Sequence, residues 1–219
     1  MRTLSTQPIN IARNMEVAMA LFHDAEAWLS ALTDHDVDAL ARTIDDDGIA
    51  CIPGFLSPDD LRYIRAFVAA TLTQSGQQSV SLGAHEIPGS GLEKLASSAQ
   101  FKKLFSRLFT ASLHRAPPEV TFYQVLRCLT GGDIRRDSYL FHYDSYAITA
   151  LLPLEIPTSG QRGDLLLLPN TRRVRSSYLA NVVDKLLLDN PVSQWLLRRR
   201  VSAPSMTRVS MEPGSLYLF

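Results

Sequence analysis

The sequence predicts an α+β chain in which helices precede an antiparallel jelly-roll core of short strands. Apolar residues recur every three or four positions up to about residue 46, which is typical of amphipathic helices. After residue 119, short runs of β-forming residues alternate with glycine and proline turns. We therefore expect a helical segment, residues 1–46, that packs on a second unit, residues 47–219.

Helices are expected mainly in the first half. Ser57 fits the N-cap of one of them, because its hydroxyl can accept hydrogen bonds from the first turn and Pro58 suits the first helical position. Residues 75–91 are polar and rich in glycine, which predicts a loop. The expected helices cover residues 11–46 with a second helix at 36–44, residues 57–73, residues 97–117, and residues 178–200 with a break at Asn190-Pro191.

The strands are expected mainly in the second half. Each is a short run rich in β-branched, leucine or aromatic residues, and most stop at a proline or glycine. The expected strands are residues 49–52, 120–129, 140–144, 146–154, 165–168, 206–211 and 215–219.

Composition excludes several classes of protein. Lys+Arg and Asp+Glu both number 22 in the 219 residues, so a net charge of zero predicts no nucleic-acid or anionic-membrane partner. Residues 1–10 lack the apolar region of a signal peptide, and the apolar runs are too short to span a bilayer. Cys51 and Cys128 lie far apart and form no disulfide framework. We expect one cytoplasmic protein of unknown oligomeric state.

One segment carries chemistry, namely Phe141-His142-Tyr143-Asp144. Residues two apart in a strand point to the same face, so His142 and Asp144 would project together. An imidazole and a carboxylate are two of the three ligands of a non-haem Fe(II) site. The alternative is a histidine that simply forms a hydrogen bond with a neighbouring acid.

Residues 47–219 resemble the Fe(II)/2-oxoglutarate-dependent dioxygenases, in particular the phytanoyl-CoA dioxygenase-like branch. The matching pieces are residues 47–57 (DGIACIPGFLS), residues 124–131 (QVLRCLTG) followed by His142-Tyr143-Asp144, residues 150–154 (ALLPL) followed by residues 163–170 (GDLLLLPN), and residues 213–219 (PGSLYLF). The resemblance implies a double-stranded β-helix, or jelly-roll, core with N-terminal and inserted helices.

The resemblance also implies an enzyme that hydroxylates or otherwise oxidises a small organic substrate with Fe(II), O2 and 2-oxoglutarate. His142 and Asp144 would hold the metal, and Tyr123, Arg127 and Thr149 are candidate contacts of the 2-oxoglutarate. The family's distal histidine and its carboxylate-binding Arg or Lys follow the last strand, and the sequence stops at Phe219 before either. We therefore expect a C-terminally truncated chain that is inactive by itself.

Two other functions stay open. A non-catalytic jelly-roll binding protein would keep the fold without a complete metal site. A cupin-like metal enzyme ranks third. Cupin sites usually draw several histidines from one strand region, whereas His142 is the one histidine near this motif. Other candidates are weaker: His85 could reach the site as a lid residue, and His23, His35 and His114 have ordinary helical roles. Arg135, Arg136, Arg172, Arg173 and Arg175 could meet an anionic substrate, although a solvated surface is the simpler interpretation. The sequence does not identify the substrate.

Overall fold

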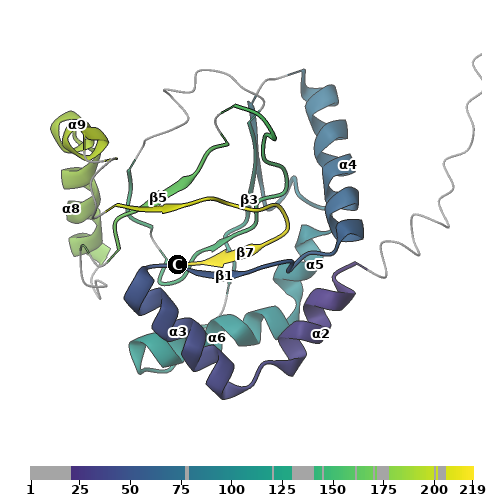
Figure 1. The fold of residues 1–219 in the computed structure, drawn as a ribbon, viewed down its shortest axis with the longest axis horizontal. Coiled ribbons are helices and arrows are strands. Elements are labelled where there is room, and N and C mark those ends of the chain that lie inside the picture. Colours follow the sequence, from purple (N-terminus) through teal and green to yellow (C-terminus); the bar gives the residue numbers. More distant parts are fainter. Residues whose placement is uncertain are drawn as a thin grey trace, which may run out of the picture.

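The computed structural model describes residues 21–76, 79–119, 121–129, 141–144, 146–160, 162–169, 171, 178–199, 201 and 206–219. Within these ranges the chain mixes helices with three small antiparallel sheets (Figure 1). The first part of the predicted helix 11–46, up to residue 20, and the candidates Arg135, Arg136, Arg172, Arg173 and Arg175 lie outside them.

Several helices begin where the sequence offers a side-chain cap. Ser57 accepts a hydrogen bond from the backbone N–H of Asp60, and Pro58 is the first helical residue, as predicted. Thr33 caps its helix in the same way, and Ser98 accepts from the Phe101 N–H. The helices are α2 (His23–Ala31), α3 (Asp34–Asp47), α4 (Pro58–Ser75), α5 (Leu92–Ser97), α6 (Ala99–Leu113), α8 (Tyr178–Asp189) and α9 (Pro191–Arg199).

The largest described sheet has three strands in the order β1-β7-β4, namely Ala50–Ile52, Leu216–Leu218 and Ala150–Leu151. Every residue of β7 is buried: it is the central strand, and its Leu216 and Leu218 belong to the core cluster that the helices share. Two strand pairs complete the set: β2 (Ser79–Gly83) with β3 (Val125–Leu129), and β5 (Leu165–Leu167) with β6 (Thr207–Val209).

The larger of two buried apolar clusters in the described residues joins the N-terminal helices to the sheet. Leu29, Val37, Leu104 and Leu216 belong to the same buried cluster, so α2, α3 and α6 pack together against β7. Figure 1 shows these helices along one side of the three-stranded sheet. Burial of this apolar surface is the main source of stability.

The structure corrects several predicted elements. Residues 79–83 were expected in a loop but form β2, because the polar stretch pairs with β3. Residues 141–144 were expected to be a strand but have no regular secondary structure, and only residues 150–151 of the predicted strand 146–154 form β4. The predicted helix 97–117 ends at Leu113. The predicted break between α8 and α9 is confirmed, and Asn190 caps α9 by accepting from the Ser193 N–H.

Candidate functional site

His142 and Asp144 lie side by side although they are not in a strand. The distance from His142 Nε2 to Asp144 Oδ1 is 3.3 Å, and the two side chains expose 64% and 33% of their surface. The pair is therefore held by its own polar contact at a partly open surface. This contact agrees with the simpler interpretation, in which the histidine only forms a hydrogen bond with a neighbouring acid. It also brings together two atoms that can bind a metal.

Thr149 fixes the other oxygen of the Asp144 carboxylate. The Thr149 hydroxyl donates to Asp144 Oδ2 at 2.5 Å. Thr149 is held in turn by Phe219 through two main-chain hydrogen bonds, of 2.7 Å from the Thr149 N–H and 3.1 Å from the Phe219 N–H. The end of β7 therefore positions one side of the motif.

The pKa of the Asp144 carboxyl group is lowered. The largest cause is the hydrogen bond with His142, and the Thr149 hydroxyl and the positive charges of His142 and Lys185 act in the same direction. Partial burial opposes them, because it disfavours the charged form. Asp144 is therefore ionised at neutral pH, which is the form that binds a metal.

Helix α9 holds the other side of the motif through Gln194. The Gln194 Oε1 atom accepts from the Phe141 N–H at 3.1 Å, and its Nε2 donates to the Phe141 carbonyl at 2.7 Å. A further bond reaches the Leu188 carbonyl on α8 at 3.0 Å. Gln194 is buried, and its amide group bonds to both the N–H and the carbonyl of Phe141, as a neighbouring strand would. The sequence offers no signal for this contact, because 53 positions separate the two residues.

The pair fits two adjacent positions around a metal ion. Two ligand atoms about 2.1 Å from one ion, at a right angle or slightly wider, are roughly 3.0–3.3 Å apart. The 3.3 Å between His142 Nε2 and Asp144 Oδ1 lies at the upper end of that range. Within the ranges that the structure describes, however, no group of three or more His, Cys, Asp or Glu side chains could hold a metal ion. Among the described residues, His142 and Asp144 therefore stand as a pair, without a further side chain of these types that would complete a metal site.

The other predicted cofactor contacts lie on an exposed surface. Tyr123 exposes 74% of its surface and stacks on Tyr146, with ring centroids 6.2 Å apart. Arg127 is exposed on β3, whereas Leu126 and Cys128 on the opposite face are buried. Side chains along β3 therefore alternate between exposed and buried, and of the three predicted contacts Thr149 is the one that touches Asp144. Burial raises the pKa of the Cys128 thiol.

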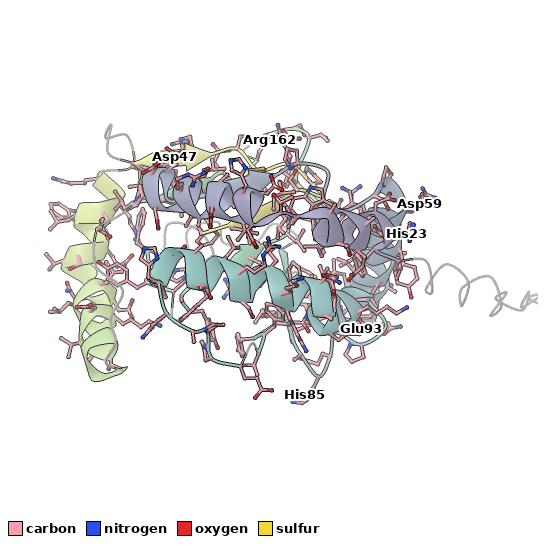
Figure 2. All side chains as sticks on the ribbon, turned by 90° about the horizontal axis from the view of Figure 1, so that it is seen from below. His23, Asp47, Asp59, His85, Glu93 and Arg162 are labelled. Atoms are coloured by element: carbon pink, nitrogen blue, oxygen red, sulfur yellow. The ribbon has the colours of Figure 1, made fainter. Side chains whose placement is uncertain are left out.

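The remaining histidines do not join the pair among the described residues. Figure 2 shows His85 at the tip of a loop and His23 at a distant part of the surface. His85 is exposed, and its neighbour Glu86 accepts from the Gly83 N–H in the same turn. His114 ends α6 in a left-handed conformation, as the predicted helix-closing residue.

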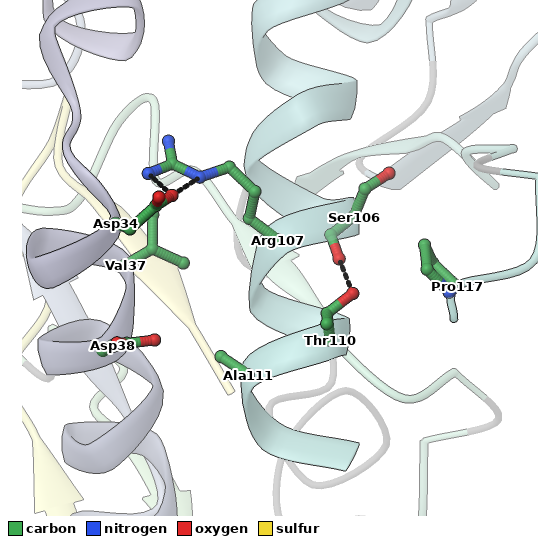
Figure 3. A pocket seen from close by; sticks show the side chains of 8 residues that line it. All are labelled: Asp34, Val37, Asp38, Ser106, Arg107, Thr110, Ala111 and Pro117. Carbon is green, nitrogen blue, oxygen red and sulfur yellow. Dashed lines mark hydrogen bonds and ion pairs between the residues drawn. The ribbon is translucent and has the colours of Figure 1, made fainter. Parts of the chain in front are cut away.

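A shallow cavity of about 300 Å³ lies elsewhere, between α3 and α6 (Figure 3). Its one arginine, Arg107, forms an ion pair with Asp34 and donates to the Leu32 carbonyl. Because these contacts hold the two helices together, the pair stabilises the fold.

In the described part of the chain, no helix is both long and apolar enough to cross a membrane. Comparisons with protein-family models, with curated proteins and with solved structures found no match for this chain.

Proposed function

We propose that this chain carries part of an Fe(II)- and 2-oxoglutarate-dependent oxygenase that oxidises a small organic substrate. The observation that supports the proposal best is the 3.3 Å approach of His142 Nε2 and Asp144 Oδ1, which matches two neighbouring metal ligands. The order of the motifs in residues 47–219 supports the same assignment. Three small antiparallel sheets are compatible with part of a jelly-roll core.

The surroundings of the pair suit a preorganised site. Thr149 fixes one carboxylate oxygen of Asp144 and leaves the other beside His142. Gln194 fixes the main chain of Phe141 immediately before the histidine. When bound, Fe(II) with 2-oxoglutarate would supply the oxidising chemistry, while these residues orient the ligands. Tyr123 and Arg127 are the proposed partners of the 2-oxoglutarate carboxylates, since both carry donors at an exposed face.

The resemblance implies a third ligand, a histidine, and an arginine or lysine that would bind the far carboxylate of 2-oxoglutarate. The described residues assign neither of these side chains, so the proposal rests on His142 and Asp144.

Anaerobic Fe(II) binding, measured by titration calorimetry, tests the proposal on the 219-residue chain. His142→Ala and Asp144→Ala should each weaken Fe(II) binding at least about tenfold. His85→Ala is a matched control, because it removes an exposed histidine that also has an acidic neighbour. Equal affinity of wild type and His142→Ala would overturn the assignment. In a longer chain that carries a downstream histidine and arginine, His142→Ala should also abolish 2-oxoglutarate turnover.

One observation favours the rival, a non-catalytic jelly-roll binding protein. Asp144 is already satisfied by His142 and Thr149, and a third ligand does not stand beside them among the described residues. The rival predicts that wild type and His142→Ala both fail to bind Fe(II), in the given chain and in a longer one. The same titration therefore separates the two functions.

A further inference from the structure

Helices α8 and α9 expose an apolar stripe. They follow one another at one edge of the molecule, with Asn190 between them, and Figure 1 shows α9 end-on beside the upright α8, so the two helices meet at a corner. Nine large apolar side chains are exposed in the described parts of the chain, and six of them belong to this helix pair. They are Val183, Leu186 and Leu187 on α8, and Val192, Trp195 and Leu196 on α9. This concentration indicates one continuous surface rather than scattered exposed residues.

The stripe faces outward because the opposite side of each of the two helices is anchored. At 100° per residue, Gln194 lies about 200° around α9 from both Val192 and Leu196. Its side chain is buried and is bonded to the main chain of Phe141. On α8, Lys185 lies about 200° from Val183, and its charge acts on Asp144. The polar faces therefore point to the body of the protein, and rotation of either helix would break these contacts.

The size and composition of the stripe are those of an interface. Its six side chains expose 47–67% of their surfaces, which together amount to roughly 600 Å². This is close to the roughly 800 Å² per partner of an ordinary stable interface. The guanidinium of Arg199 lies 3.8 Å from the centroid of the Trp195 ring. Tryptophan and arginine are the residue types most enriched where binding energy concentrates.

We propose that the α8–α9 stripe is the interface of a two-fold symmetric dimer of this chain. A two-fold axis near Trp195 places the two α9 helices antiparallel, so the stripe of one copy packs on the same stripe of the other copy. Asp189, exposed at the end of α8, then lies near the end of α9 that carries Arg199 in the second copy. This pairing of opposite charges across the two-fold axis is the observation that favours a second copy of this chain as the partner.

Sedimentation velocity tests the proposal on the 219-residue chain, from about 1 µM to about 200 µM. The expected result is a reversible monomer–dimer equilibrium. Trp195→Glu and Leu186→Glu should each weaken the dimer about 30-fold or more, because each places a charge in the centre of an apolar contact. Arg199→Glu should weaken it less, and combination with Asp189→Arg should restore part of the affinity.

Val125→Glu is the matched control, because Val125 is an exposed apolar residue on β3, outside α8 and α9. It should leave the dimer intact, and circular dichroism must show the same helical content for all variants. A chain that stays monomeric throughout the concentration range would overturn the proposal. So would a dimer that tolerates both Trp195→Glu and Leu186→Glu, or a monomer that binds anionic phosphatidylserine vesicles through the stripe.

Discussion

Asp60→Ala should destabilise the protein by about 3–5 kcal/mol, the cost of breaking a buried charged network. Asp60 is 3% exposed. Its Oδ1 accepts from the Phe22 N–H at 2.8 Å, and its Oδ2 accepts from the Ser57 N–H at 3.1 Å and from the Ser57 hydroxyl at 2.7 Å. The carboxylate thus joins the start of α4 to the entry of α2, where Phe22 is buried in the core. Truncation leaves both N–H groups without this acceptor and opens a small cavity.

Urea denaturation followed by circular dichroism measures the effect. With a slope of about 2.5 kcal/mol per molar, the midpoint should fall by roughly 1–2 M. Asp59→Ala is the control: it removes the same side chain one position earlier, where 78% of it is exposed and its partner is the exposed Arg62. That change should cost less than about 1 kcal/mol. If Asp60→Ala and Asp59→Ala shifted the midpoint equally, the role assigned to the buried network would be refuted.

Three further predictions concern other parts of the chain. Gly48→Ala should lower the unfolding free energy by about 3 kcal/mol, because Gly48 has φ of +79° and an added Cβ would lie 2.4 Å from Pro169 Cβ. Thr149→Val should raise the pKa of Asp144 toward its usual value, as measured by carboxyl carbon NMR. Ionised Asp144 stabilises the fold at pH values above its unfolded-state pKa, and this stabilisation is lost as the pH falls through its lowered folded-state pKa. Because the folded-state pKa is higher in Thr149→Val, the variant should lose this stabilisation at a higher pH than the wild type. Gln194→Leu should cost about 2 kcal/mol in urea denaturation, because it removes both main-chain bonds to the motif.

Each of these has its own control. Gly54 also has a positive φ, +62°, but an added Cβ meets nothing within 4 Å, so Gly54→Ala should show the backbone cost alone, about 1 kcal/mol. Thr171→Val removes a hydroxyl that donates to its own turn and should leave the titration of Asp144 unchanged. Gln194→Glu would place a buried carboxylate against the Phe141 and Leu188 carbonyls, so at neutral pH it should cost more than Gln194→Leu.

Local signals predicted the elements whose ends are set by neighbouring residues. Ser57 and Pro58 placed the start of α4 to the residue, because a cap and a first helical position involve contacts within one turn. The Asn190-Pro191 break between α8 and α9 was predicted for the same reason. The alternation of exposed and buried residues along β3 also followed from the strand period.

Tertiary contacts decided the elements that the local pattern missed. The polar residues 79–83 carry little strand propensity of their own, and β2 forms because Val80 and Leu82 pair with Cys128 and Leu126 on β3. Residues 141–144 contain β-forming side chains, yet Gln194 supplies a side-chain partner to Phe141 in place of a neighbouring strand. Hydrogen-bond partners from distant residues override weak local preferences.

The sequence by itself determined which side chains of the candidate site are chemically suited to a metal, His142 and Asp144, since residue identity sets ligand chemistry. It also determined the caps and breaks of α4 and α9. The tertiary structure alone decided that Thr149, Phe219 and Gln194 hold this pair from two directions, and that the apolar stripe of α8–α9 faces outward. The physical reason is range: chemistry and capping depend on a residue and its turn, whereas orientation depends on partners brought together by the fold.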